Sequence, residues 1–176
     1  MKLFLTRHGQ TDWNTKRLVC GRSQAQLTAL GKAQAAQVGE QAAQAGVNVI
    51  WASPLDRTQE TASIIAEKVG VPVLTEPLLI EQDFGAFEGR SMDDPEYLQK
   101  RENILWHFSG GESVVQVMHR AYTVLEKVKE HYSDQTVLLV THGAFCRAAR
   151  TYFMDSPVGG FYDFYMENCQ LLEFKL

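Results

Sequence analysis

Cysteine is scarce in this chain, and the three residues present show no pattern typical of a disulfide framework or a metal site. Cys20, Cys146 and Cys169 are odd in number and form no Cys-x-x-Cys pair. A disulfide framework needs an even set of cysteines, and a zinc site usually shows closely spaced ones. We therefore expect neither feature, and we expect the chain to work in a reducing cytoplasm.

Long hydrophobic runs and a strong excess of positive charge are also missing. The apolar run near the start, Leu3-Phe4-Leu5, is too short for a signal peptide or a membrane span. The formal net charge is −4, and there is no stripe of Lys and Arg to neutralise a nucleic-acid backbone. We expect neither a membrane partner nor a nucleic-acid partner, and the oligomeric state is not readable from the sequence.

Internal repeats, linkers and low-complexity tracts are absent as well. The five prolines and thirteen glycines occur singly or in turns, and apolar residues make up 45% of the 176 positions. A chain of this length and composition can bury a substantial core. We therefore expect a single domain that covers residues 1–176.

Stretches typical of strands alternate with stretches typical of helices. Thr28 suits the N-cap of the first long helix, Gly46 and Gly70 suit helix ends, and Pro72 favours the edge of a sheet. The alternation predicts a three-layer α/β/α fold with a mostly parallel central sheet and helices on both faces. Strands are expected at residues 2–6, 47–51, 71–74 and 136–140, and helices at residues 29–45, 58–69, 113–132 and 144–153.

Two parts of the chain depart from this alternation. Residues 77–111 have poor periodicity and mix Gly, Asp, Pro and aromatic residues, with one helix expected near residues 95–107. At the end of the chain, two strands near residues 161–166 and 169–175 are expected to form a hairpin.

Three of the expected strands are followed directly by polar residues. Arg7 and His8 follow the first strand, Ser53 to Arg57 follow the second, and His142 follows the fourth. In a largely parallel sheet, ligands bind beyond the carboxyl ends of the strands. The order of the elements therefore predicts that these residues meet at one site.

The residue types at these strand ends suit a bound phosphate. Arg7 and Arg57 each offer a fixed fork of donors, and their charge persists at neutral pH. His8 can act as a neutral nucleophile, a base or a metal ligand, and Gly9 lets the backbone approach a ligand closely or adopt positive φ. Taken one at a time, Arg7 and His8 could begin a surface loop, Arg57 could form a helix-surface ion pair, and His142 could cap a helix.

The order of several separated motifs resembles that of a known family. Arg7-His8-Gly9 is followed by Asn14, by Ser53-Pro54-Leu55-Asp56-Arg57-Thr58, by Glu81 and by Thr141-His142-Gly143. This pattern is similar to the histidine phosphatase superfamily, which includes cofactor-dependent phosphoglycerate mutases and many small phosphatases. The ending Asn168-Cys169-Gln170-Leu171-Leu172 also resembles the last strand of that family. The resemblance implies a phosphoglycerate mutase-like fold and a covalent phosphohistidine at His8.

The resemblance also implies roles for the matched cationic groups. Arg7 and Arg57 would grip the non-bridging phosphate oxygens. His142 would donate to the phosphoryl oxygens, and it opens onto Gly143 at the start of a helix, where backbone N–H groups favour anions. Polar contacts to the substrate are expected from Asn14 and, more weakly, from Gln10 and Thr11.

A carboxyl group is needed to protonate the leaving alkoxide and then to activate water. Spacing alone does not choose between Glu81, Asp83 and Glu88. The segment from Glu81 to Gly89 is similar to the acid segment of the family, in which the first Glu holds the role. We therefore expect Glu81 to be the general acid and then the base.

A metal ion or other cofactor is not expected. A site built from His8 and His142 is conceivable, but no His-x-His or His-Glu-x-x-His spacing supports it, and the adjacent Arg7 would repel a cation. The only partner expected is a small phosphate ester.

The choice between hydrolysis and phosphoryl transfer within the family depends on the irregular segment. His142 lies only 61 positions after Glu81. The irregular segment has a single pair of adjacent basic residues, Lys100-Arg101, and nothing in the sequence fixes this pair over the site. Mutases of the family carry a longer stretch with more basic residues, so we expect hydrolysis of a small phosphorylated metabolite. The alternatives are a phosphoglycerate mutase and a non-catalytic phosphate-binding module. Residues 82–109 are expected to set the substrate, and the role of Glu112 is not readable.

Overall fold

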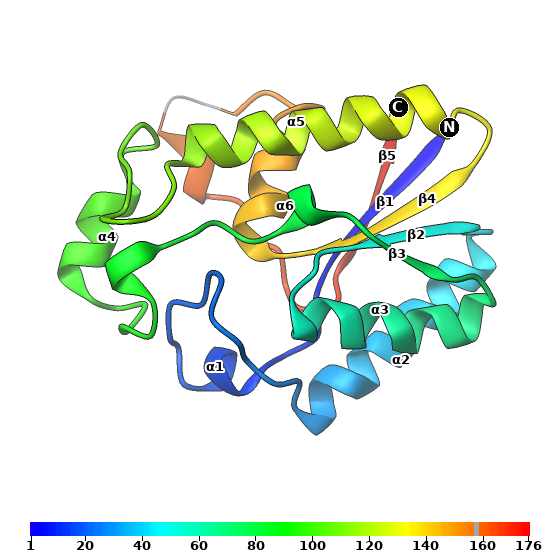
Figure 1. Ribbon diagram of the computed structural model, residues 1–176, viewed down its shortest axis with the longest axis horizontal. Helices are drawn as coiled ribbons and strands as arrows, with labels where there is room; N and C mark the ends of the chain where they lie inside the picture. The colour runs from blue at the N-terminus through cyan, green and yellow to red at the C-terminus, as the bar shows by residue number, and fades with distance from the viewer. Residues whose placement is uncertain (157–158) are drawn as a thin grey trace.

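The computed structural model describes residues 1–156 and 159–176, and its centre is a five-stranded sheet (Figure 1). The strand order is β3-β2-β4-β1-β5. The first four strands of this order run parallel to their neighbours, and β5 runs antiparallel to β1. The strands are β1 (Lys2–Arg7), β2 (Val49–Ala52), β3 (Val73–Thr75), β4 (Thr136–Thr141) and β5 (Leu171–Lys175).

Helices cover both faces of the sheet (Figure 1). On one face, α2 (Ala29–Gln44) and α3 (Asp56–Val69) pack on Phe4, Ile50 and Leu138, all of them buried. On the other face, α5 (Val114–His131) and α6 (Gly143–Arg150) pack on side chains that alternate with these along the strands, such as Leu3 and Leu5. The three-layer α/β/α arrangement predicted from the sequence is confirmed.

The helix ends use the capping residues that the sequence supplies. The Thr28 side chain accepts the N–H of Gly31 at the start of α2. Gly70 ends α3 in the left-handed region at φ 81°, where a side chain would be strained. Ser113 and Gln116 form a capping box before α5. These caps place the helix boundaries within a few residues of the predicted ones.

The predicted C-terminal hairpin is wrong. Only the second of its two strands forms, as β5, and it pairs with β1 at the edge of the sheet. Within residues 161–166 the chain forms the end of a 3₁₀ turn, η3 (Gly160–Tyr162), followed by irregular backbone. The aromatic side chains here pack against arginines rather than in a strand, with Phe161 and Tyr162 over Arg147 and Phe164 over Arg150. The segment is rich in aromatic residues, which favour strands, but here these contacts hold it as a loop.

A separate group of elements lies beyond the carboxyl ends of the parallel strands (Figure 1). It contains α1 (Asp12–Thr15), the 3₁₀ turn η2 (Gly85–Phe87) and α4 (Pro95–Arg101), which is shorter than the predicted helix at 95–107. The 3₁₀ turn η1 (Pro77–Leu79) instead packs into the main core through Leu79. Phe84, Phe87, Tyr97 and Phe108 form a small aromatic core here. None of the helices in the described ranges is long and apolar enough to cross a membrane.

Candidate active site

Three strand ends bring the predicted residues together. His8 follows β1, Ser53 follows β2 and His142 follows β4. The rings of His8 and His142 meet edge to face with centroids 5.4 Å apart, and Ser53 Oγ lies 2.7 Å from His142 Nε2. These residues therefore meet as the strand order predicts. Gly9 packs closely on α2, because a Cβ there would lie 2.4 Å from the Gly31 carbonyl oxygen.

His8 lines a cavity at this edge of the sheet with one ring nitrogen free. Its backbone carbonyl accepts from Asn168 Nδ2 at 2.9 Å, and its ring Nδ1 lies 2.8 Å from the Gly9 carbonyl oxygen. A carbonyl only accepts hydrogen bonds, so Nδ1 carries the proton and Nε2 keeps its lone pair. Burial lowers the pKa of His8 well below its usual 6.5, and the positive charges of Arg57 and Arg7 lower it further. His8 is therefore a neutral imidazole with an unprotonated nitrogen.

His142 is fully buried behind His8. Ser53 Oγ accepts the N–H of Leu55 at 3.5 Å, so its own proton is available to donate to His142 Nε2. This network assigns the ring proton to Nδ1, which has no hydrogen-bond partner among the described residues. Burial lowers the pKa of His142 well below its usual value, and the charge of Arg57 acts in the same direction. The ring is therefore neutral and holds a free donor.

Arg7 and Arg57 are oriented by uncharged acceptors. Arg7 Nη1 donates to the Tyr165 hydroxyl at 2.8 Å. Arg57 donates from its two terminal nitrogens to the carbonyl groups of Ser23 at 2.9 Å and Gly21 at 2.6 Å. Because these acceptors fix the guanidinium groups without neutralising their charge, both groups remain attractive to an anion.

Buried donors that lack partners gather at this site. In the described part of the chain four buried side-chain polar atoms have no hydrogen-bond partner: Arg7 Nε, Arg57 Nε, His142 Nδ1 and, outside the site, Trp51 Nε1. An unpaired buried donor costs about 1–3 kcal/mol, so such groups are rarely left together without a reason. Three N–H donors, two of them on charged groups, suit a ligand with several negatively charged oxygens.

Glu81 is held at the N-terminal end of α6, on the wall of the cavity. Its Oε1 accepts the N–H of Gln82 at 2.8 Å and of Phe145 at 3.2 Å, and its Oε2 accepts the N–H of Ala144 at 3.0 Å. The helix N–H groups that the sequence offered to an anion are thus taken by this carboxylate. Oε2 has one partner and Oε1 has two, so Oε2 has the greater capacity to exchange a proton with a ligand.

The other two candidate carboxyl groups do not line the cavity. Glu88 accepts the N–H groups of Gly21, Arg22 and Ser23 at 3.0, 3.0 and 3.3 Å. Asp83 Oδ1 accepts the N–H of Gly85 at 2.9 Å. Both carboxylates organise loops around the cavity, which leaves Glu81 as the carboxyl group best placed to meet a ligand.

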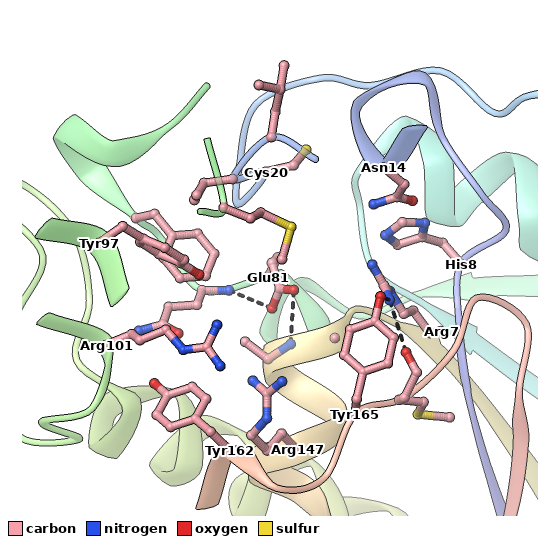
Figure 2. A pocket seen from close by; sticks show the side chains of 18 residues that line it. Arg7, His8, Asn14, Cys20, Glu81, Tyr97, Arg101, Arg147, Tyr162 and Tyr165 are labelled. Atoms are coloured by element: carbon pink, nitrogen blue, oxygen red, sulfur yellow. Dashed lines mark hydrogen bonds between the residues drawn. The ribbon is translucent and has the colours of Figure 1, made fainter. Parts of the chain in front are cut away.

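Asn14 and Gly143 also line the cavity, and Figure 2 shows Asn14 beside His8. Asn14 Oδ1 accepts from the Thr11 N–H at 3.0 Å and from Asn168 Nδ2 at 3.2 Å, so the amide nitrogen is the end left for a ligand. Asn168 donates to both Asn14 and the His8 carbonyl, and the sequence matched it only to the last strand of the family, without a role in the site.

Gln10 lies away from the cavity. Its Oε1 accepts from the Thr28 hydroxyl at 2.9 Å, and its N–H donates to Gln34 Oε1 at 3.0 Å. Both partners belong to the first part of α2 or its cap. The structure therefore places Gln10 at the junction of β1 and α2, and not beside His8.

The far wall of the cavity is built from residues that the sequence motifs missed (Figure 2). Arg147 lies four positions after Gly143 on α6, so helical spacing was a signal for it. Arg101, whose position over the cavity the sequence left open, comes from the end of α4. The missed residues are Leu18, Val19, Cys20, Gln82, Phe84, Met92, Tyr97, Arg101, Ala144, Arg147, Tyr162, Tyr165 and Met166.

Glu112 and Arg120 brace the segment that carries Glu81. Arg120 Nη2 lies 3.1 Å from Glu112 Oε2, and Arg120 Nη1 donates to the carbonyl groups of Leu78, at 2.9 Å, and Ile80. Glu112 in turn accepts the N–H of Asp83 at 3.0 Å. The Glu112–Arg120 pair therefore fixes the backbone on both sides of Glu81.

Metal ligands are not clustered in residues 1–156 and 159–176, where no group of three or more His, Cys, Asp or Glu side chains could hold an ion. The independence from metal expected from the sequence remains a prediction for experiment.

Comparison with known proteins shows which family this chain resembles along its length. The family model described as histidine phosphatase superfamily (branch 1) matches residues 3–176. Among curated proteins, one named probable phosphoglycerate mutase GpmB from Yersinia enterocolitica is 33% identical over 97% of this chain and 83% of its own length. Its counterpart in Klebsiella pneumoniae is 38% identical over 81% of this chain and 70% of its own length.

Solved structures resemble the whole chain. A mycobacterial glucosyl-3-phosphoglycerate phosphatase complexed with VO3 has a TM-score of 0.88 and 28% identity, covering 98% of this chain and 91% of that one. A phosphoserine phosphatase from Entamoeba histolytica, in complex with 3-phosphoglyceric acid, has a TM-score of 0.86 and 25% identity, covering 99% of this chain and 90% of that one.

Proposed function

The chain belongs to the histidine phosphatase superfamily (branch 1), and we propose that it is a phosphatase that hydrolyses a small phosphorylated metabolite through a phosphohistidine on His8, without a metal ion. The observation that carries this proposal is the set of unpartnered donors on Arg7, Arg57 and His142, near a neutral His8 whose Nε2 is free. A nucleophile and donors of this kind suit phosphoryl transfer, in which positioning and charge stabilisation do most of the work.

In the first step His8 Nε2 attacks phosphorus. The phosphate is held by Arg7, Arg57 and the Nδ1–H of His142, whose donors oppose the charge that develops on the oxygens. The P–N bond forms as the P–O bond to the leaving group breaks, and Glu81 gives a proton to the departing alkoxide oxygen. Because Nδ1–H of His8 donates to the Gly9 carbonyl, the imidazole ring keeps the same orientation throughout this step.

In the second step water attacks the phosphohistidine. Glu81, now a carboxylate, takes a proton from the water as its oxygen bonds to phosphorus, and the P–N bond breaks. Inorganic phosphate is released, and His8 and Glu81 return to their starting protonation states. The same carboxyl group serves as acid and then as base, as its place on the cavity wall allows.

A phosphoglycerate mutase is the second candidate. Two observations favour it: the curated relatives bear that name, and Arg101 lines the cavity, a basic residue that the sequence alone did not place there. A mutase would return the phosphoryl group from His8 to a second position of the substrate instead of to water.

A screen of phosphate release tests the proposal. The purified protein would be dialysed against EDTA and assayed with sugar, nucleotide, phosphoglycerate and phosphopeptide esters, with His8→Ala as the inactive control. We expect metal-free release from one class of small ester. Activity that returns only with a divalent ion would contradict independence from metal, and exchange between phosphoglycerates without phosphate release would favour the mutase.

A further inference from the structure

A turn just before β5, residues 167–170, donates hydrogen bonds to the two residues at the end of β1. The N–H of Cys169 donates to the Arg7 carbonyl at 2.9 Å, and Asn168 Nδ2 donates to the His8 carbonyl at 2.9 Å. Because β5 pairs antiparallel with β1, the turn reaches this strand end from the edge of the sheet. The proposed nucleophile and its neighbouring arginine are therefore held by a turn from the far end of the sequence.

The shape of this turn is fixed by its own hydrogen bonds. The Gln170 N–H donates to the Glu167 carbonyl at 3.2 Å, and Gln170 Oε1 accepts the Glu167 N–H at 3.1 Å. Cys169 adopts φ 56°, in the left-handed region that residues other than glycine seldom occupy. Such a conformation persists where the surrounding structure requires it. Here it allows the Cys169 N–H and the Asn168 side chain to meet the same strand end.

The amide group of Asn168 determines which end of the Asn14 amide faces the cavity. Asn168 Nδ2 lies 2.9 Å from the His8 carbonyl oxygen and 3.2 Å from Asn14 Oδ1. A backbone carbonyl only accepts, so the NH₂ end of Asn168, and not its oxygen, faces His8 and Asn14. Asn14 therefore turns its own oxygen toward Asn168, where the Thr11 N–H also donates to it at 3.0 Å. The NH₂ group of Asn14 is left as a donor on the cavity wall beside His8 (Figure 2).

We propose that Asn168 is a positioning residue for phosphoryl transfer at His8, an inference that rests on the proposed function. Asn168 has two tasks: it holds the backbone that carries His8, and it orients Asn14 as a donor to the phosphate. A reversed Asn14 amide would present an oxygen to the phosphate oxygens, and no hydrogen bond could form between them. Because one amide nitrogen makes both contacts, Asn168 ties the place of the nucleophile to the place of a phosphate donor.

A double-mutant cycle tests the orientation of Asn14 without requiring turnover. Calorimetry would measure the binding of inorganic phosphate to the unaltered protein, to Asn14→Ala, to Asn168→Ala and to the double variant. We expect Asn14→Ala to bind phosphate about 10- to 100-fold more weakly, the usual contribution of a hydrogen bond to a charged group. Asn168→Ala should lose a part of this affinity, and the double variant should bind no more weakly than Asn14→Ala, because Asn168 acts on phosphate through Asn14. Glu167→Gln is the matched control, at an exposed position in the same turn.

Turnover of p-nitrophenyl phosphate tests the support of His8. In the Asn14→Ala background, Asn168→Ala should leave phosphate affinity unchanged but still lower kcat by about 10-fold, because the His8 carbonyl loses its donor and the nucleophile is less well placed. A residue that only supports the fold would change both quantities or neither. Asn168→Leu keeps a side chain of similar shape without the donor, and it repeats the cycle if Asn168→Ala does not fold.

The outcomes separate this inference from the proposed function. Losses of phosphate affinity that multiply in the double variant would overturn the positioning role and leave the phosphatase proposal intact. A lower Tm for Asn168→Ala, with phosphate affinity and kcat unchanged, would overturn it in the same way. An unaltered protein that releases phosphate from no ester would contradict hydrolysis, while non-additive losses of phosphate affinity in that protein would still support the orientation of Asn14 by Asn168.

Discussion

Glu88 and Arg57 both hydrogen-bond to the backbone of one loop, residues 21–23. Glu88 binds the N–H groups of the loop, and Arg57 binds its carbonyl groups. The Glu88 carboxylate accepts the N–H groups of all three residues, while Arg57 donates to the carbonyl groups of Gly21 and Ser23. These contacts leave no room for a side chain at Gly21, where a Cβ would lie 2.2 Å from Glu88 Oε1. Glu88 therefore helps to fix Arg57, the arginine proposed to bind phosphate, through the loop that both residues contact.

We predict that Glu88→Gln lowers kcat/KM for p-nitrophenyl phosphate by about 10- to 100-fold, because small misplacements of a binding group have effects of this size. A glutamine presents an NH₂ group where the loop needs an acceptor, so Arg57 loses its fixed support. Inorganic phosphate, used as a competitive inhibitor, should bind correspondingly more weakly. Glu102→Gln, at an exposed position in the same region, is the control. A lower Tm with unchanged phosphate inhibition would show that Glu88 supports the fold alone.

The positions of the main site residues were predictable because they depend on strand order. Arg7, His8 and His142 follow buried parallel strands directly, and the geometry of such a sheet brings their ends together whatever the loops do. Glu81 does not follow a strand of the sheet in this way. Its place depends on the Glu112–Arg120 pair and on amide groups of α6, so only the resemblance to the family pointed to it.

The far end of the cavity was not predictable, because it depends on tertiary packing of irregular segments. Arg101 faces the cavity only because α4 stops at that residue and packs through Tyr97 into the small aromatic core. Tyr162 and Tyr165 belong to the segment near residues 161–166 that was expected to form a strand. Their side chains contact arginines instead, an outcome that sequence periodicity does not encode.

Burial of two neutral histidines predicts that stability falls in mild acid. The pKa values of His8 and His142 are depressed in the folded chain, so the unfolded chain binds more protons below about pH 6.5. The stability that the two neutral histidines contribute is fully present above pH 6.5. It is lost progressively as the pH falls toward their lower pKa values in the folded chain. Each histidine should lower the free energy of unfolding by up to about 1.4 kcal/mol per pH unit in that range.

Urea denaturation between pH 7.5 and 5 measures this dependence, at pH values chosen around the unfolded pKa of about 6.5. His142→Gln should show a shallower decline than the unaltered protein, because one of the two protonation sites is gone. His131→Gln controls for the removal of an exposed imidazole. Parallel declines in the unaltered protein and in His142→Gln would contradict a buried neutral His142.

Glu81 should matter most for substrates with poor leaving groups. An alkoxide needs protonation as it departs, whereas p-nitrophenolate does not, so we expect Glu81→Gln to lose more activity on alkyl phosphates than on aryl ones. The loss on alkyl esters should be about 10²- to 10⁴-fold, the usual range for a general acid. Asp83→Asn is the matched control, since its carboxylate binds a loop N–H away from the cavity. If Asp83→Asn shows the selective loss and Glu81→Gln does not, the acid is Asp83.

The covalent step itself is open to direct measurement. His8 and His142 both follow parallel strands and precede glycines. They differ in that His8 lines the cavity and has an unprotonated Nε2. The ring nitrogen of His142 that lacks a partner, Nδ1, carries a proton and is a donor. Rapid quenching during turnover of ³²P-labelled substrate, followed by peptide mapping, would locate the phosphoryl group. We predict an acid-labile, base-stable label on the peptide that contains His8, and no label in His8→Ala. A label that survives that substitution, or that maps to the peptide containing His142, would contradict the account.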